Sequence, residues 1–462
     1  MRMILSGISR ATLGLLVSAV VAAPTQARCQ ISVSPGEDVR DAFDRAMAEQ
    51  CSVHFLAGKH LTTTRLGVTL IGTAEDPVII SGEGNAVSHL HRPNREQSII
   101  DLSAKHLVVR DLTFSGGSRG VRLERSSSHA RFERIVVHST GNAAFMASTR
   151  DETYTDIVVR RSEFYDTSGS GECLHLGCNH GACTFYDSQI VGNSCHDTRS
   201  REGRDHASGL VLEGGSEAVL VRNNVFTNTY GLAILTYANG GKRPNVLEGN
   251  LVFNQHGGSG IQVTGDVLVR NNVVILEGIE GEAGFVGSPS QQGTPNNLVV
   301  LHNTIVRRAG AGRCMSFRGW RGEAPRIIVA NNAVYCPEGE ALYVGDNTQL
   351  GLIVSNAIEG TTSLRVGTFA AGAWQDELVA PFSAANAYPR EGASVLGNAD
   401  VVLSIPSDFN CRARRVPSDV GAYGRLEARN IGRTSAITFK RCVAPAPSLP
   451  PLPVPQLPSP DK

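Results

Sequence analysis

The chain has 462 residues with 43 basic and 43 acidic side chains, so its formal charge at neutral pH is zero. This balance excludes the broad basic surface that nucleic-acid-binding proteins use, and we expect no nucleic acid partner. The 49 glycines and the aromatic content of only 6% favour a fold with many tight turns.

The first 27 residues have the pattern of a secretory signal peptide. Arg2 and Arg10 form a basic start, Ala11–Ala23 is an apolar run too short to span a membrane, and Thr25-Gln26-Ala27 offers a cleavage site. Cleavage after Ala23 and retention as an uncleaved anchor are the alternatives. No later segment reaches the roughly 18 apolar residues of a membrane span. We therefore expect a secreted or periplasmic protein without a transmembrane segment.

Residues 28–52 are predicted to form an N-terminal cap that contains a helix over about Val39–Glu49. Glu37 and Asp38 place acids at the start of this helix, where the helix dipole favours negative charge. One apolar face, suited to covering the open edge of a sheet, is formed by Val39, Ala42, Phe43 and Ala46.

A short phrase that ends in Val, Ile or Phe recurs from residue 114 to residue 358, at intervals of 22 to 36 residues. A clear copy is Val221-Arg222-Asn223-Asn224-Val225-Phe226. Each copy is too short and too rich in β-branched residues for a helix pair, and it predicts a strand. A period near 22 residues with variable excess predicts one solenoid coil plus loops. Six asparagines share one register in these copies: Asn224, Asn250, Asn272, Asn303, Asn332 and Asn356.

A second phrase alternates with the first and begins with a small residue followed by apolar, any and apolar residues. Cys173-Leu174-His175-Leu176 and Gly209-Leu210-Val211-Leu212 are two copies. Two strand signals in each period predict a coiled ribbon of parallel strands. The asparagines should then stack inside one bend, with their side-chain amides hydrogen-bonded from coil to coil.

With these repeats, the chain resembles the right-handed parallel β-helix proteins of the pectate-lyase-like superfamily over roughly residues 31–425. The resemblance implies an all-β fold, with a right-handed parallel β-helix over residues 53–425 and a capping helix at its N-terminal end. It leaves the activity open, because this scaffold hosts lyases, hydrolases, epimerases and non-enzymatic adhesins.

The asparagine phrase stops after Ile358. The looser segment that follows ends in Asp419-Val420-Gly421-Ala422-Tyr423, which is similar to the ending of many bacterial surface β-helix proteins, and we expect it to cap the last coil. Residues 426–442 form a further C-terminal segment. Residues 443–462 are rich in proline and are predicted to be a disordered tail.

Ten cysteines in an exported chain favour five disulfides. The expected pairs are Cys29–Cys51, Cys173–Cys195, Cys178–Cys183, Cys314–Cys336 and Cys411–Cys442. The alternative is a zinc site, because Cys173, His175, Cys178, His180 and Cys183 form a dense run of metal-binding residue types.

In the second phrase, the position between the two apolar residues points away from the core, and successive coils stack these positions into a column. Arg122 and His175, two coils apart, should lie roughly 10 Å from each other. The next outward position adds Glu124 and Glu213. The column is expected to contain Arg122, Phe145, His175, Val211, Ala233, Gln262, Ser316 and Tyr343.

The largest insertion, between Ile190 and Phe226, lies beside this column and contains the charged run His196–His206. A loop this charged on a regular scaffold often carries function, although a solvated loop with local ion pairs is the plain alternative. The candidate substrate-binding residues are Arg122, Glu172, His196, Asp197, Arg199, Arg201, Asp205 and Tyr230.

These groups suit acid–base chemistry on an acidic sugar polymer. His175 is the first candidate for the catalytic base and His206 the second, because imidazole titrates near working pH. Arg204 is the favoured clamp for a uronate carboxylate, and Glu213 is a supporting acid. Two carboxylates alone would instead suit hydrolysis of a glycosidic bond. No metal ligands are assigned, although Ca²⁺ is an option for the oxygens of Glu172, Asp197, Asp205 and Glu213.

The catalytic signatures of the known β-helix enzymes are absent. The chain lacks the Arg-x-Pro-x-x-Arg pattern of one pectate lyase group and the Gly-His-Gly pattern of polygalacturonases, and Lys242 is the only lysine in the central coils. The predicted function is a secreted lyase of acidic, uronate-containing polysaccharides. The alternative is a non-catalytic cell-surface or carbohydrate-binding β-helix protein. We expect a monomer whose partner is a polysaccharide.

Overall fold

The computed structural model describes residues 28–424, apart from residues 170, 200–206, 241, 254–257, 278–282, 290–291, 293–296, 321–325, 346–347, 349–350, 365, 381–384 and 386. The predicted signal peptide and proline-rich tail therefore lie outside the described residues. Within the described part of the chain, no helix has both the length and the apolar character needed to cross a membrane.

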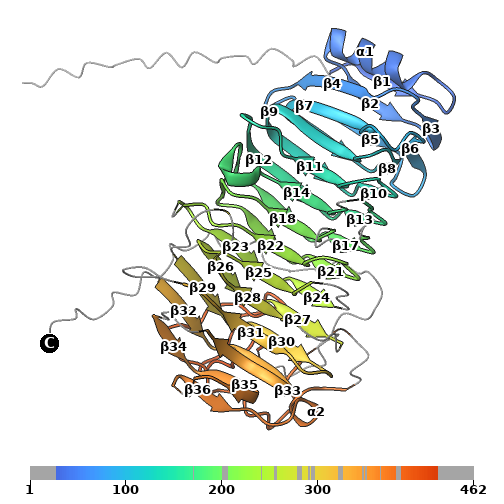
Figure 1. Cartoon of the computed structure of the whole chain (residues 1–462). Coiled ribbons are helices and arrows are strands. Elements are labelled where there is room, and N and C mark those ends of the chain that lie inside the picture. Colours follow the sequence, from blue (N-terminus) through green and yellow to red (C-terminus); the bar gives the residue numbers. More distant parts are fainter. Residues whose placement is uncertain are drawn as a thin grey trace, which may run out of the picture.

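The chain winds into a solenoid of about ten coils whose strands pair in parallel with the strands of the next coil (Figure 1). This confirms the predicted parallel β-helix. The coils present three sheets, which we call A, B and C. Each coil contributes one strand to each sheet, and the longer strands β7, β9 and β33 bend around a corner to serve two sheets.

Sheet A, which corresponds to the second sequence phrase, contains β4 (Leu66–Ile71), β7 (Ile100–Arg110), β9 (Val121–Glu133), β11 (Phe145–Ala147), β14 (Leu174–Leu176), β18 (Leu210–Leu212), β22 (Ile234–Thr236), β25 (Ile261–Val263), β28 (Phe285–Gly287), β31 (Arg313–Phe317) and β33 (Ala333–Val344). Sheet B contains β1 (Gln30–Val33), β2 (Ser52–Phe55), β5 (Val78–Gly82), β7, β9, β12 (Thr153–Arg160), β16 (Gln189–Val191), β20 (Leu220–Arg222), β23 (Asn245–Glu248), β26 (Val267–Arg270), β29 (Asn297–Leu301), β32 (Arg326–Ala330) and β34 (Leu352–Val354), with β15 (Thr184–Tyr186) and β19 (Ser216–Glu217) at its edge.

Sheet C contains β3 (Gly58–Leu61), β6 (Ser88–Arg92), β8 (Thr113–Gly116), β10 (Val136–His138), β13 (Glu163–Tyr165), β17 (Ser194–His196), β21 (Val225–Thr227), β24 (Leu251–Phe253), β27 (Val273–Leu276), β30 (Thr304–Arg307), β33, β35 (Asn356–Thr362) and β36 (Thr368–Ala370). The inward side chains of all three sheets fill one continuous core, in which Val, Ile, Leu and Phe alternate with outward residues along each strand.

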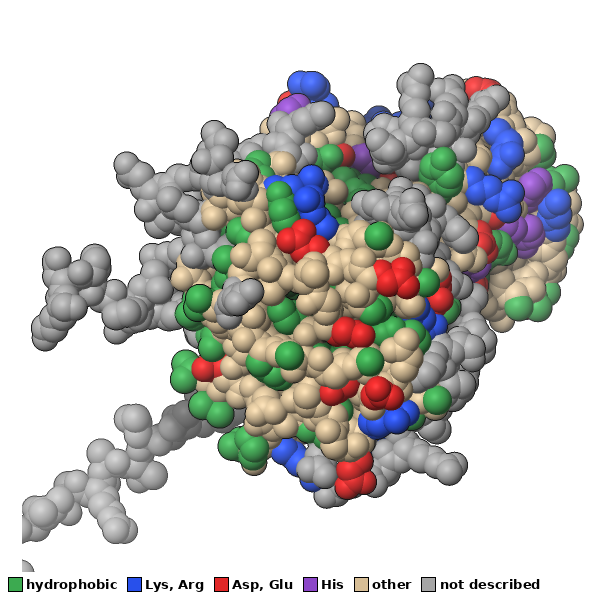
Figure 2. Space-filling view, turned by 60° about the horizontal axis from the view of Figure 1, so that its bottom comes forward, with side chains coloured by type: hydrophobic (Ala, Val, Ile, Leu, Met, Phe, Trp, Pro, Cys, Tyr) green, Lys and Arg blue, Asp and Glu red, His purple; other side chains and the backbone are tan. Residues whose placement is uncertain are grey.

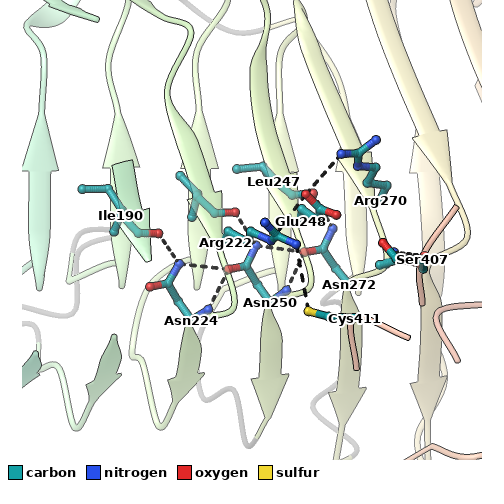
Figure 3. Close-up of polar contacts among 12 residues, drawn as sticks. Ile190, Arg222, Asn224, Leu247, Glu248, Asn250, Arg270, Asn272, Ser407 and Cys411 are labelled. Carbon is teal, nitrogen blue, oxygen red and sulfur yellow. Dashed lines mark hydrogen bonds and ion pairs between the residues drawn. The ribbon is translucent and has the colours of Figure 1, made fainter. Parts of the chain in front are cut away.

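The asparagine ladder forms at the bend between sheets B and C (Figure 3). The Nδ2 group of Asn250 donates to Oδ1 of Asn272 at 2.9 Å, and that of Asn272 donates to Oδ1 of Asn303 at 3.0 Å. The same contact links all six predicted asparagines, which are at most 3% exposed, and it extends upstream to Asn193. The predicted stack is confirmed.

The residue before each ladder asparagine has a left-handed backbone conformation. This conformation produces the sharp bend between sheets B and C. Asn271 has φ +53° and Asn331 has φ +57°. Asparagine tolerates this conformation better than most side chains because its short amide bonds locally, and glycine serves the same purpose at Gly249. This explains the Asn-Asn and Gly-Asn copies of the sequence phrase; in the two remaining copies His302 (φ +50°) and Ser355 (φ +51°) adopt the same conformation.

The predicted helix is confirmed as α1 (Val39–Glu49), at the N-terminal end of the solenoid (Figure 1). The carboxylate of Asp38 caps it by accepting from the main-chain N–H of Arg40 at 2.8 Å. Phe43 on its apolar face lies 6.0 Å from Phe55, between ring centroids, so the helix packs on the first coils.

The prediction that residues 419–423 cap the last coil is wrong. After α2 (Trp374–Glu377), the chain runs back along the outside of the solenoid: the main-chain N–H of Gly421 donates to Asn331 O, and that of Ala422 donates to Thr304 Oγ1, each at 2.8 Å. Burial of apolar side chains explains this path of the chain. Trp374, Tyr388 and Tyr423 share a buried cluster with outward residues of sheet C that would otherwise face water, among them Val273 and Tyr335.

Arg414 fixes this segment, which we call the C-terminal strap (residues 374–423). Its Nη2 group donates to Asn271 Oδ1 at 2.7 Å and to the carbonyl oxygen of Gly421 at 2.8 Å. Burial lowers the pKa of Arg414 to about 10, while Asp408 and Asp419 act in the opposite direction. The guanidinium therefore stays charged at neutral pH and joins the strap to the solenoid wall.

Four of the expected disulfides are formed among the described residues: Cys29–Cys51, Cys173–Cys195, Cys178–Cys183 and Cys314–Cys336. Cys411 is also disulfide-bonded, and its predicted partner Cys442 lies outside the described residues. The zinc alternative needed the thiolates of Cys173, Cys178 and Cys183, which these bonds consume.

Non-reducing peptide mapping of the purified protein should recover these four pairs and detect no free thiol after denaturation. We expect the result because each pair joins cysteines of successive coils or of one turn, with Cα atoms 4.8 to 6.1 Å apart. Free thiols at Cys173 and Cys178 together with bound zinc would contradict it.

Candidate functional site

The outward column of sheet A runs in the order Arg122, Met146, His175, Val211, Leu235. The expectation that Phe145 and Ala233 belong to it is wrong. Phe145 is the first residue of β11, and its side chain is buried in the core. The sequence prediction placed this strand one residue out of register, and a shift of one residue moves a side chain to the other face of the sheet. Ala233 lies in the turn before β22, and Leu235 takes its place. Arg122 and His175 are two coils apart, as predicted.

His175 and Glu213 form the centre of the candidate site. His175 lies in the middle of β14, and its Nε2 atom is 3.5 Å from Oε1 of Glu213, which directly follows β18 on the next coil. The imidazole is 20% exposed, whereas the carboxylate is only 6% exposed. A reachable imidazole thus lies beside a buried carboxyl group, an arrangement suited to proton transfer at the sheet surface.

Gln292 and Asn179 hold the carboxyl group of Glu213. Gln292, from the segment after β28 three coils away, donates from Nε2 to Glu213 Oε2 at 2.7 Å, while its Oε1 accepts from the main-chain N–H groups of His180 and Gly214. The amide of Asn179, oriented to satisfy both groups, donates to the two oxygens of Glu213 at 2.9 and 3.0 Å. The Cys178–Cys183 disulfide closes the short turn that carries Asn179.

Burial raises the pKa of Glu213 above its ordinary value, and the hydrogen bond from Gln292 opposes this rise only in part. The folded protein therefore binds the Glu213 proton more tightly than the unfolded chain does.

The Glu213→Gln variant should gain stability relative to wild type as the pH rises from 4 to 7. The stability that comes from the raised pKa is fully present below the unfolded-state value and is lost as the pH rises through the folded-state value. Glutamine has no such loss because it does not ionise. Urea unfolding at pH 4, 5, 6 and 7 measures the difference, and a difference that stays constant over this range would contradict the assignment.

Two further predicted residues lie near this pair. Arg122 donates to Thr149 Oγ1 at 3.3 Å and forms an ion pair with Glu124 at 3.0 Å. Glu172 is buried at the corner before β14. Both lie at the N-terminal side of His175, where Met146 separates Arg122 from His175 in the outward column; Val211 and Leu235, on the other side, are buried and apolar.

The structure does not bring His196 and Asp197 to His175. His196 ends β17 of sheet C, where it bonds Glu163 through Nε2 at 3.0 Å and Asp197 through Nδ1 at 2.7 Å. Burial alone would lower the pKa of His196, but the hydrogen bonds to both carboxylates raise it above its ordinary value. A corner of the coil separates sheet C, which carries His196 and Asp197, from sheet A, which carries His175. The sequence alone does not show this corner.

Arg199 and Tyr230 lie on this corner as well. Arg199 is 73% exposed and its ion pair with Asp166 is long, at 3.8 Å. Tyr230 is 39% exposed, and its main-chain N–H donates to Thr198 Oγ1. The remaining predicted residues, Arg201, Arg204, Asp205 and His206, lie outside the described residues.

A row of rings that the sequence reading missed covers the N-terminal part of sheet C. His138 stacks on Tyr165 with centroids 4.8 Å apart, and Tyr165 stacks on His196 at 5.0 Å. His89 lies 5.9 Å from His138. Figure 2 shows histidine side chains gathered over these N-terminal coils, beside Lys and Arg side chains. The His138–Tyr165 and Tyr165–His196 pairs are stacked, whereas the rings of His89 and His138 are tilted.

No calcium site emerges from the described residues. The predicted oxygen ligands Glu213 and Asp197 belong to different sheets, and the only cluster of potential metal ligands in the described chain contains Glu49 and the disulfide-bonded Cys29 and Cys51. Calcium dependence therefore stays a prediction to be tested with substrate.

Sequence reasoning missed Gln292, Asn179 and Met146. It also missed Arg119, whose Nε group donates to Met146 Sδ at 3.0 Å. Arg119 had a usable signal, since it directly precedes the small residue of a second-phrase copy, as Glu172 does. Gln292 had no such signal in the sequence, because it lies in an irregular insertion and only folding brings it to Glu213.

Comparisons with known proteins agree with this architecture. A family model described as a right handed beta helix region matches residues 59–226. Among solved structures, the pectate lyase Pel9A is 12% identical over 87% of this chain and 97% of its own, with a TM-score of 0.50. A mutant of the PL6 family alginate lyase AlyGC is 16% identical over 86% of this chain and 59% of its own, with a TM-score of 0.52.

An alginate lyase from Paenibacillus sp. str. FPU-7 is 16% identical over 63% of this chain and 98% of its own, with a TM-score of 0.47. A comparison with curated protein sequences gave no match. At these identities the solved structures establish the fold alone. The chain is a right-handed parallel β-helix protein, and its structural neighbours are pectate lyase and other polysaccharide-active β-helix proteins.

Proposed function

We propose that this protein is a lyase of acidic, uronate-containing polysaccharides and that the reaction takes place on the outer face of sheet A at His175. The observation that carries the proposal is the partly exposed imidazole of His175 beside the buried carboxyl group of Glu213. The polysaccharide-active structural neighbours support a sugar polymer as the substrate class.

The chemistry requires a base next to a bound uronate. His175 takes the proton from C5, the C5–H electrons form the C4–C5 double bond, and the C4–O bond to the leaving sugar breaks. The imidazolium of His175 can return its proton to the departing oxygen. Glu213 supports this step because an ionised carboxylate 3.5 Å away stabilises the imidazolium, while Gln292 and Asn179 keep that carboxylate in place.

The disulfides also support a location outside the cytoplasm. Disulfides persist in oxidising compartments, so the four bonds are compatible with a secreted or periplasmic protein, in which a polymer is reached outside the cytoplasm.

The deciding experiment is a screen of pectate, alginate and other acidic polysaccharides, with and without Ca²⁺. Absorbance of the unsaturated product reports elimination, and new reducing ends report any cleavage. The lyase proposal requires both signals on at least one polymer. Reducing ends without absorbance would indicate a hydrolase, and binding without either signal would favour the alternative of a carbohydrate-binding β-helix protein.

A further inference from the structure

Arg119 has a guanidinium group that forms no ion pair with any carboxylate among the described residues. It directly precedes Gly120 at the corner where the chain enters sheet A, and it is half-buried. Its Nε group donates to Met146 Sδ at 3.0 Å, and no ion pair is formed by it within the described part of the chain. The neighbouring Arg65 and Arg122 differ, since each is paired with Glu124.

The contact with Met146 places Arg119 beside the candidate site. Met146 pairs with Arg122 on one side and with His175 on the other in the outward column. Adjacent strands of such a sheet are about 4.8 Å apart, so a guanidinium held on Met146 lies about one coil from the imidazole of His175. That distance is within the size of one sugar ring.

Electrostatics make this cation ready for an anionic ligand. Burial is the main cause that lowers the pKa of Arg119, repulsion from Arg122 adds to it, and Asp101 and Glu172 act in the opposite direction. A partly desolvated cation next to a second cation lacks the stabilisation that a bound carboxylate would supply. Its two Nη groups form the planar fork that matches a carboxylate with two parallel hydrogen bonds.

We propose that Arg119 binds the carboxylate of the uronate residue seated on Met146, and that it thereby gives the site its preference for acidic over neutral sugar polymers. This inference rests on the proposed function. It gives Arg119 the same type of role that the sequence analysis predicts for Arg204, and it makes Arg119 a specificity-determining residue of the same site.

The test compares binding of uronate trisaccharides from pectate and from alginate with binding of the same trisaccharides after reduction of their carboxylates to alcohols. Calorimetry on the full-length exported protein gives both affinities. Wild type should bind at least one acidic trisaccharide tenfold or more tightly than its reduced form. Arg119→Gln should lose most of this preference and bind the reduced form as wild type does. Arg119→Met, which keeps the aliphatic packing on Met146, should lose it equally.

Arg150→Gln is the matched control, because this substitution removes the same charge. Arg150 is an exposed arginine at the far corner of the coil that contains Met146. It should keep the wild-type preference. Equal loss in Arg150→Gln, or an unchanged preference in both Arg119 variants, would overturn the inference. Failure of the proposed function is distinguishable, because it shows as absent turnover in the wild-type protein, whatever the binding preference.

Discussion

Replacing His175 by alanine should reduce turnover of the cleaved polymer by about 10²- to 10⁴-fold, the usual contribution of a general base. The melting temperature should stay within a few degrees of wild type, because the imidazole lies at the sheet surface and is not part of the core. Initial rates from product absorbance, together with thermal melting followed by circular dichroism, measure both quantities. The Arg204→Ala variant, whose position lies outside the described residues, is predicted from the sequence to lose turnover as well.

His106→Asn provides the control for the histidine variant. His106 follows the sheet A part of β7 at a corner, has φ +50°, and stacks on His129 at 4.5 Å, so asparagine suits its backbone and no site contact is removed. It should retain full activity. Wild-type rates in both His175→Ala and Arg204→Ala would place the site elsewhere on the solenoid.

The second large effect concerns stability. Asn272→Leu should lower the free energy of unfolding by about 3 kcal/mol or more, because each buried polar group left without a partner costs about 1–3 kcal/mol. The main-chain N–H and the Nδ2 group of Asn250 both donate to Oδ1 of Asn272, and Asn272 Nδ2 donates to Leu247 O. All of these contacts are lost in the variant. Chemical denaturation measures the change.

Asn398→Leu is the comparison, since Asn398 is exposed and its side chain makes a single hydrogen bond to Ser394 O. It should change the free energy of unfolding by less than about 1 kcal/mol. Equal effects of the two substitutions would show that the ladder contributes no special stability.

The solenoid was predictable because each coil has to satisfy the same physical demands. A buried amide at the bend needs a partner in the next coil, so Asn224, Asn250 and Asn272 recur at one register, and their spacing can be read from the chain. The cysteine pairs were predictable for a related reason: Cys173 and Cys195 are 22 residues apart, as are Cys314 and Cys336, and this is the length of one coil.

The geometry of the candidate site was predictable only where the repeat determines it. The placement of His175 and Glu213 on neighbouring coils could be predicted because strand alternation fixes which residues face outward. The placement of the loop residues could not be predicted, since a corner of unknown angle separates His196 from His175. The contacts of Gln292 and of the C-terminal strap could not be predicted from the sequence, because they span 79 and 143 residues and follow no period.

The C-terminal strap also changes the local unfolding that is expected of the solenoid. In a simple solenoid each coil contacts only its neighbours, so the ends fray and unfolding spreads coil by coil. Here Arg414, Tyr423 and Trp374 connect coils from Val225 to Ala357 directly to one another. Amide hydrogen exchange in these coils should follow one common opening event, whereas exchange in the coils before Val225 should fall off gradually toward α1. The pair His175 and Glu213 lies before these connected coils, and the hydrogen bond from Gln292 to Glu213 links it to them.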